Sequence, residues 1–169
     1  DWPEVVSHLP NLATLSMSEC DLPPMSLSSL PYLNHSKSRT SLKHLDLSDN
    51  QLAHIPKSFG DISLESLDLS DNQLAHIPKS FGDICTLREL YLSSNNLNGQ
   101  LVELMNNLSE CAKNSLEVLD LSLNQITGSF PNFAIFPSLK DINLSHNKLN
   151  DTVPKSIGNL YKVEVLSVS

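Results

Sequence analysis

One 18-residue sequence, LDLSDNQLAHIPKSFGDI, occurs twice in this chain, at residues 45–62 and again, unchanged, at 67–84. The two copies start 22 residues apart. A catalytic centre needs side chains with different roles, whereas a scaffold of stacked units is built by repetition. Exact duplication at this spacing therefore predicts a repeat architecture.

The duplicated segment is part of a longer pattern, Leu-x-x-Leu-x-Leu-x-x-Asn-x-Leu. With Ile, Met or Val at some apolar positions, the pattern starts seven times, at Leu12, Leu42, Leu64, Leu87, Leu116, Leu139 and Val163. Its spacing is typical of leucine-rich repeats, whose period is about 20–29 residues. We predict one α/β domain over residues 1–169, a right-handed leucine-rich-repeat solenoid of about six and a half repeats. It should have a parallel concave β-sheet and no capping domains.

Each recurring position has a physical role. The Leu-x-Leu pair alternates along a short strand, so both leucines face a shared apolar interior and their neighbours face solvent. The asparagine follows the strand, where its side chain can satisfy backbone groups that the turn leaves unpaired. Cys20 occupies the asparagine position of the first repeat, and we expect it to be a free, buried thiol.

Two stretches resemble the extension of plant-type leucine-rich repeats: LNQITGSFPNFAIFPSL and LNDTVPKSIGNL. The duplicated copies lack its glycine, Val102 replaces its proline and Asp151 replaces a glycine. The opening 22 residues and the segment 85–122 resemble plant receptor-like proteins related to the ethylene-inducing xylanase receptors. That resemblance implies an internal segment of a longer ectodomain on the extracellular face of the plasma membrane. The implied function is recognition of a microbial protein or peptide in defence, with a co-receptor kinase as a further partner.

Two other functions share parts of this pattern. Secreted inhibitors of microbial wall-degrading enzymes, such as polygalacturonase inhibitors, have plant-type repeats but are short solenoids with disulfide-bonded caps, which this chain does not show. An ice-binding solenoid would need a regular array of Thr or Asn, and the outward positions here are too charged and irregular. A membrane helix downstream in the full reading frame would distinguish a receptor from a secreted inhibitor.

Charge and motifs exclude several classes of function. There are 11 Lys and Arg against 19 Asp and Glu, a formal net charge of −8, which disfavours nucleic acid and anionic membrane surfaces as partners. The chain does not open like a signal peptide, and no apolar run approaches the roughly 20 residues that span a bilayer. No nucleotide-binding or hydrolase motif is present. His54 and His76 recur only through the duplication and are expected to be solvated turn residues and not metal ligands. From the missing motifs and these histidines together, we predict no enzyme activity, no cofactor and no metal.

Two features favour an extracellular setting. Four N-x-S/T sequons begin at Asn34, Asn107, Asn143 and Asn150, and the first two lie in connections between repeats, where glycosylation is most expected. Cys85 and Cys111 fall at the ends of adjacent repeats, so stacking can bring them within the Cα separation of about 4.4–6.8 Å that a disulfide needs. Two buried free thiols are the alternative.

The outward positions of the strands form the predicted ligand-binding surface. The residues singled out there are Asp46, Glu65, Asp68, Glu89, Tyr91, Asp120 and Asp141. Stacked carboxylates repel one another, so a negative surface would suit a basic protein or peptide ligand, with Tyr91 as an aromatic anchor. The alternative is that Leu-Asp-Leu-Ser is merely a soluble strand sequence. Identical repeats cannot each be tuned to a different part of a ligand, so specificity is expected in the non-identical ones.

Overall fold

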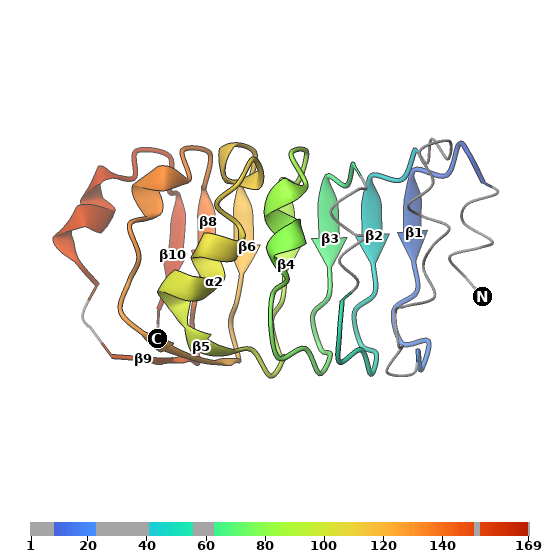
Figure 1. Ribbon diagram of the computed structural model, residues 1–169, viewed down its shortest axis with the longest axis horizontal. Coiled ribbons are helices and arrows are strands. Elements are labelled where there is room, and N and C mark those ends of the chain that lie inside the picture. Colours follow the sequence, from blue (N-terminus) through green and yellow to red (C-terminus); the bar gives the residue numbers. More distant parts are fainter. Residues whose placement is uncertain (1–8, 23–40, 56–62, 151–152, 169) are drawn as a thin grey trace.

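The computed structural model describes residues 9–22, 41–55, 63–150 and 153–168 (Figure 1). One short strand from each repeat joins a seven-stranded parallel sheet, which we call the main sheet, in the order β1-β2-β3-β4-β6-β8-β10. Its strands are β1 (Thr14–Ser16), β2 (His44–Asp46), β3 (Ser66–Asp68), β4 (Glu89–Tyr91), β6 (Val118–Asp120), β8 (Asp141–Asn143) and β10 (Val165–Ser167). The predicted leucine-rich-repeat solenoid with a parallel sheet is confirmed.

Strand register places equivalent repeat positions side by side. Leu45 pairs with Leu67, Leu67 with Leu90, and Leu90 with Leu119. These leucines point into the interior and are at most 3% exposed. Because side chains alternate along a strand, the residues on either side of each leucine share the outer face of the sheet. The register therefore builds straight rows of outward side chains that cross all the repeats.

A second parallel sheet, which the sequence analysis did not predict, has the order β5-β7-β9. Its strands are β5 (Asn98–Gln100), β7 (Gln125–Gly128) and β9 (Lys148–Leu149), and they lie along the plant-type extension. Gly99 and Gly128 have φ angles of 91° and 87°, a conformation that glycine adopts without steric cost. Both duplicated copies lack this glycine, and their described residues 51–55 and 73–78 form no strand.

Short helices lie on the side opposite the main sheet. They are η3 (Lys79–Asp83), α2 (Leu101–Asn107), η4 (Ala112–Asn114), η5 (Phe133–Ile135) and η6 (Lys155–Asn159). The fourth repeat is longer than its neighbours because it contains both α2 and η4. The end of α2 packs closely on η3: a Cβ on Gly82 would lie 2.8 Å from the carbonyl oxygen of Asn107. None of the helices in the described ranges is long and apolar enough to cross a membrane.

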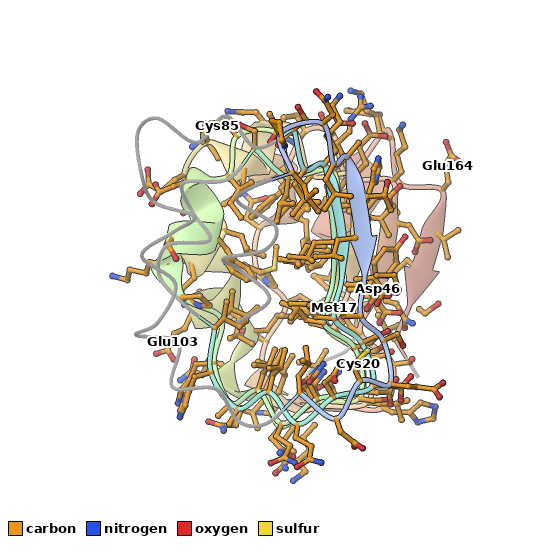
Figure 2. All side chains as sticks on the ribbon, turned by 90° about the vertical axis from the view of Figure 1, so that its right-hand side faces the viewer. Met17, Cys20, Asp46, Cys85, Glu103 and Glu164 are labelled. Atoms are coloured by element: carbon orange, nitrogen blue, oxygen red, sulfur yellow. A yellow bond between two sulfur atoms is a disulfide. The ribbon has the colours of Figure 1, made fainter. Side chains whose placement is uncertain are left out.

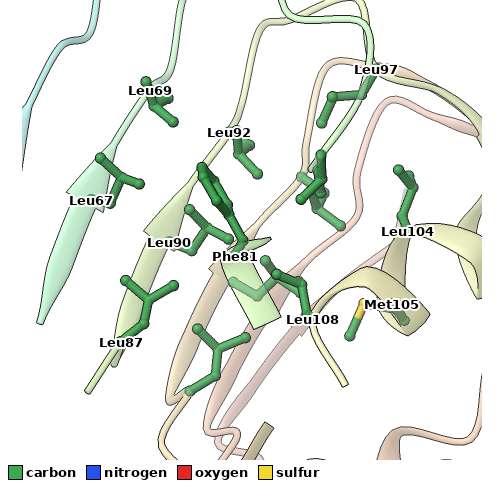
Figure 3. Close-up of a cluster of buried hydrophobic side chains, with 14 of the residues drawn as sticks. Leu67, Leu69, Phe81, Leu87, Leu90, Leu92, Leu97, Leu104, Met105 and Leu108 are labelled. Carbon is green, nitrogen blue, oxygen red and sulfur yellow. The ribbon is translucent and has the colours of Figure 1, made fainter. Parts of the chain in front are cut away.

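The core fills the space between the main sheet and these helices (Figures 2 and 3). Leu67 and Leu90 approach it from the sheet, Phe81 from η3, and Leu104 and Leu108 from α2 and its C-terminal end. Phe81 is fully buried, and Ile157, its equivalent in a later repeat, packs against the core. The third residue of this predicted stack, Phe59, lies outside the described residues.

The asparagine position joins each repeat to the one before it. Asn72 Nδ2 donates to Leu47 O of the preceding repeat at 2.9 Å and to two carbonyls of its own repeat, and its Oδ1 accepts from Leu52 N at 3.0 Å. The same pattern recurs at Asn50, Asn95, Asn124 and Asn147. The predicted role of this position is confirmed.

The prediction that Cys20 is buried is wrong. Its thiol is free, as expected, but exposed. In every later repeat this position faces the carbonyls of the preceding repeat, as Asn50 faces Met17 O at 2.9 Å. Cys20 belongs to the first described repeat, so no described repeat lies on the side that would cover it. Its sulfur is 3.4 Å from Ser18 O.

Candidate ligand-binding surface

All seven residues predicted to bind ligand lie on the outer face of the main sheet. They are Asp46, Glu65, Asp68, Glu89, Tyr91, Asp120 and Asp141, and each is half-buried. Figure 2 shows Asp46 and Glu164 on this outer side, with the helices across the core. The seven residues fall into groups that differ in their hydrogen bonds and ion pairs.

Glu65 belongs to a row of alternating charge along the beginning of the strands, which we call the charge-paired row. Its members are Lys43, Glu65, Arg88, Glu117, Lys140 and Glu164. Lys43 Nζ lies 2.7 Å from Glu65 Oε1, Arg88 Nη2 lies 3.0 Å from Glu117 Oε1, and Lys140 pairs with the other oxygen of Glu117. Three positive and three negative side chains cancel in this row, so it adds little to a negative surface.

The pairing also lowers the pKa values of two carboxylates in this row. The hydrogen bond from Lys43, with smaller help from the charges of Lys43, His44 and Arg88, lowers the pKa of Glu65. The hydrogen bond from Lys140, together with the charge of Arg88, likewise lowers the pKa of Glu117. Both carboxylates are therefore held in the charged form by residues of the chain itself, not left free for a ligand.

The aspartates at the strand ends also have a structural role. Asp46 Oδ1 accepts from the amide of Ser48 at 3.0 Å and from its hydroxyl at 2.7 Å, and Oδ2 accepts from Ser16 Oγ at 2.8 Å. Burial raises the pKa of Asp46, but these hydrogen bonds outweigh it and leave the pKa lowered. Asp68, Asp120 and Asn143 bind the amide two residues ahead in the same way. The Leu-Asp-Leu-Ser sequence thus stabilises each turn, whatever it does for a ligand.

Four carboxylates lie around Tyr91 on the outer face, and we call them the acidic ring: Asp68, Glu89 and Asp120 on the same or the neighbouring strands, and Asp141 on β8, two strands away. Tyr91 pairs with Asp68 of β3 on one side and with Asp120 of β6 on the other. Glu89 lies two residues earlier on the same face of β4. Burial and the negative charges of Glu89, Asp68, Asp141 and Asp120 raise the pKa of Tyr91. These charges concentrate negative potential around one half-buried aromatic side chain.

Glu89 and Asp141 differ from the other members of the acidic ring. Among the described residues no hydrogen bond or ion pair engages either carboxylate, whereas Asp68 accepts from Ser70 and Asp120 accepts from Ser122 and Asn143. A cation from a ligand would meet no competing partner at Glu89 and Asp141. Within the described chain, these two carboxylates are therefore the members of the acidic ring that have no partner.

Two predicted glycosylation sites use their side-chain nitrogen in hydrogen bonds to other residues of the chain. Asn107 Nδ2 donates to Ile77 O at 2.9 Å, and Asn143 Nδ2 donates to Asp120 Oδ2 at 3.2 Å. Asn150 is exposed, and Asn34 lies outside the described residues. Of the two sites that the sequence favoured, Asn107 thus has its side-chain nitrogen bonded to the backbone of the preceding repeat.

A disulfide joins Cys85 to Cys111, with a Cα–Cα distance of 4.9 Å that falls within the range expected from stacking. It ties the turn after η3 to the segment that follows α2, and so fixes the long fourth repeat to its neighbour. His54 and His76 are exposed, as expected. The described part of the chain contains no group of three or more His, Cys, Asp or Glu that could hold a metal ion.

Comparison with protein families agrees with this architecture. The family model "Leucine rich repeat" matches residues 40–97, and the model "Leucine Rich repeats (2 copies)" matches residues 114–168. The chain is a leucine-rich-repeat protein. Receptor-like protein 32 of Arabidopsis thaliana is 39% identical over 88 residues, and Receptor-like protein 18 is 38% identical over 82. The matches cover 50% and 48% of this chain, but only 10% and 9% of those relatives, so this leucine-rich-repeat chain spans about a tenth of their length.

Solved leucine-rich-repeat structures resemble the whole chain. The ectodomain of the Arabidopsis thaliana membrane receptor kinase GASSHO1/SCHENGEN3, in complex with CASPARIAN STRIP INTEGRITY FACTOR 2, has a TM-score of 0.73 and 30% identity. The match covers 96% of this chain and 19% of that one. A Leptospira interrogans leucine-rich-repeat protein has a TM-score of 0.74 and 27% identity, covering 99% and 39%. The similarity supports plant receptor-like proteins as a group and does not single out the ethylene-inducing xylanase receptor type.

Proposed function

We propose that the outer face of the main sheet binds a basic peptide or protein segment, with Tyr91 and the acidic ring at the centre of the contact. The observation that carries this proposal is the position of Tyr91 directly between Asp68 and Asp120 on the neighbouring strands, with Glu89 on its own strand and Asp141 two strands away. An aromatic side chain supplies a large contact area at low entropic cost, and a Lys or Arg head group is attracted both to its face and to the surrounding carboxylates. No catalytic step is part of this function.

The distribution of charge favours a cationic ligand at this place. The chain carries a formal net charge of −8, and the charge-paired row cancels its own charges. Outside that row, five carboxylates lie at outward positions of the main-sheet strands: Asp46 and the four of the acidic ring. The field of such charges accelerates encounter with an oppositely charged partner and is weakened by salt, because the screening length falls from about 10 Å at 0.1 M to about 3 Å at 1 M.

The solved relatives support a peptide as the ligand class. Besides the GASSHO1/SCHENGEN3 complex, the plant peptide hormone receptor RGFR1 has been solved with RGF2, and it is 32% identical to this chain with a TM-score of 0.64. We propose that the protein carrying this chain is a receptor-like protein at the extracellular face of the plasma membrane. We further propose that its ligand is microbial, that it acts in plant defence, and that it signals with a co-receptor kinase.

The test compares two double variants of the full-length protein that remove the same amount of charge. Glu89→Gln with Asp141→Asn neutralises the two unpaired ring carboxylates. Glu65→Gln with Glu117→Gln neutralises two carboxylates of the charge-paired row. Asp68 and Asp120 are left intact because Asp→Asn at either would create the sequon Asn-Leu-Ser. The probe is a synthetic octalysine peptide, and association and dissociation rates are measured at 0.05 M and 0.5 M salt.

We expect the ring variant to slow association about three- to ten-fold at low salt, with a smaller difference at high salt. The matched control should slow it less, because its carboxylates already neutralise cations of the chain. Equal effects of the two variants would mean that only net charge matters and would refute the ring as a site. Binding that neither variant changes would show that the ligand is recognised elsewhere.

A further inference from the structure

The turn that follows each of β1, β2, β3, β4, β6 and β8 contains a residue in the left-handed backbone conformation. In six consecutive repeats this residue has a φ of 51–56°, and the six are Glu19, Asp49, Asp71, Ser94, Leu123 and His146. We call this position the turn position. None of the six is glycine, so each incurs the steric cost of the left-handed region, which short polar side chains and histidine tolerate best.

Leu123 does not fit its turn position. A leucine gains nothing from the local hydrogen bonds that help Asp in this conformation, and five of the six turns use a polar residue. Its side chain is 52% exposed, so burial in the core does not offset the strain. Its backbone N–H donates to Ser145 O at 3.0 Å, a bond that any residue other than proline could make. Neither its exposure nor its backbone hydrogen bond therefore favours leucine over a polar residue at this place.

Leu123 borders the acidic ring. It follows Asp120 by three residues, which limits their Cα separation to about 10 Å. Asp120 in turn pairs directly with Tyr91 across strands that lie about 4.8 Å apart. An exposed apolar side chain, a carboxylate and an aromatic ring thus lie within the span of a few residues of an extended peptide.

We propose that Leu123 is a ligand-contacting residue that determines specificity by binding an apolar side chain of the ligand. The ligand is a peptide segment in which this apolar residue lies within a few positions of the basic residue bound at the acidic ring. The proposal rests on the function proposed above and adds a second requirement to it. The strain at Leu123 is then retained because the apolar contact forms only when the ligand is bound.

The experiment uses Leu123→Asn in the full-length protein, with Ser94→Asn as a matched control at the turn position of the preceding repeat. Asparagine adopts the left-handed conformation readily, and neither change creates a sequon. The probe is a random dodecapeptide display library, selected in parallel on the wild type and both variants. Thermal melting of each protein is measured beside the selections.

We expect wild-type and Ser94→Asn proteins to enrich peptides with a basic residue and a nearby Leu, Ile, Val or Phe. Leu123→Asn should retain the basic enrichment and lose the apolar enrichment about ten-fold, the loss expected for one apolar contact. Its melting temperature should equal or exceed that of the wild type by up to about 2–4 °C, because strain is relieved.

The outcomes distinguish this inference from the function on which it rests. The role of Leu123 is overturned if the selected peptides are enriched in basic residues but not in apolar ones. It is also overturned if the apolar enrichment is the same in Leu123→Asn as in the wild type. Either result leaves the acidic ring as the proposed binding site. Apolar enrichment that depends on Leu123 but has no basic residue beside it refutes the proposed pairing, and the acidic ring with it. A lower melting temperature for Leu123→Asn would show that leucine serves the fold, which also overturns the inference.

Discussion

Asp68 and Asp120 lie on opposite sides of Tyr91, each directly paired with it on a neighbouring parallel strand. In the other described repeats the same row carries Ser, Asp or Asn, so Tyr91 is its one aromatic residue among the described strands. The backbone amides of Ser70 and Ser122 donate to these two aspartates and so fix the orientation of their carboxylates. Two carboxylates of fixed orientation therefore flank the aromatic side chain.

Replacing Tyr91 by Ala should mainly accelerate dissociation of a ligand. A packed aromatic anchor commonly contributes about 2 kcal/mol, so we expect roughly a 30-fold faster off-rate, with little dependence on salt. Tyr91→Phe is the control, because it keeps the ring and removes only the hydroxyl. Surface plasmon resonance on the full-length protein measures both. If Tyr91→Ala and Tyr91→Phe have the same off-rate, the aromatic side chain of Tyr91 is not an anchor for the ligand.

Asn72→Ala should destabilise the solenoid. The change removes the donor for Leu47 O and the acceptor for Leu52 N, which leaves buried backbone groups unpaired, so we expect a loss of about 3 kcal/mol in the free energy of unfolding. Asp71→Asn, at the exposed neighbouring position, should change stability by less than about 0.5 kcal/mol. Urea denaturation compares the two. Similar midpoints for both variants would contradict the role of the asparagine position.

The main sheet was predictable from the sequence because its information is local and repeated. Leucines such as Leu67 and Leu69 alternate with the two-residue period of a strand, and the same pair recurs in each repeat. The second sheet and α2 were not predictable in this way. Their signal is not repeated in every unit, because the duplicated copies lack the glycine of the second sheet and α2 lies in the long fourth repeat. They depend on contacts between repeats, such as the register between Gly99 and Ile126.

The candidate surface was predictable in outline only. Outward positions followed from the frame, but the pairing of Glu65 with Lys43 appears only when equivalent positions of neighbouring repeats are compared for sign. The strained Leu123 gave no signal because its turn position contains no glycine in any described repeat, and glycine is the usual marker of a left-handed residue. The ion pair and the strained leucine both depend on how the repeats stack, and a linear sequence does not show which residues stacking brings together.

Glycosylation should differ among the sequons when the full-length protein is expressed through the secretory pathway. We expect Asn150, which is exposed, to be modified, and Asn107 and Asn143 to remain largely unmodified. A glycan on Nδ2 of Asn107 would lie where that nitrogen meets Ile77 O, and one on Asn143 where it meets Asp120. Glycopeptide mass spectrometry measures occupancy at each site. High occupancy at Asn107 would contradict the packing of α2 described above.

Stability should fall at acid pH. The pKa values of Asp46, Glu65 and Glu117 are lowered from their ordinary values of 3.8 and 4.5. Such groups add stability that is complete above the ordinary pKa and is lost as the pH falls through the lowered folded value. We therefore expect constant melting temperatures above about pH 5 and a decline below it. The double variant Glu65→Gln with Glu117→Gln should show a shallower decline. An equally steep decline would mean that other carboxylates dominate.

Removing the disulfide between Cys85 and Cys111 should destabilise the fourth repeat more than the rest of the solenoid. The bond closes a loop with a sequence separation of 26 residues, for which chain entropy gives about 3.5 kcal/mol. In a repeat protein each unit contacts only its neighbours, so the loss should stay local. Hydrogen exchange of the Cys85→Ser, Cys111→Ser double variant should show faster exchange in α2 and η4, with β2 and β3 little changed.

The control is Cys20→Ser, which removes the exposed free thiol and should leave exchange unaltered. Uniformly faster exchange across all strands would indicate that the repeats unfold as one cooperative unit. Peptide mapping that recovered Cys85 and Cys111 as separate alkylated thiols from the native protein would contradict the bond itself.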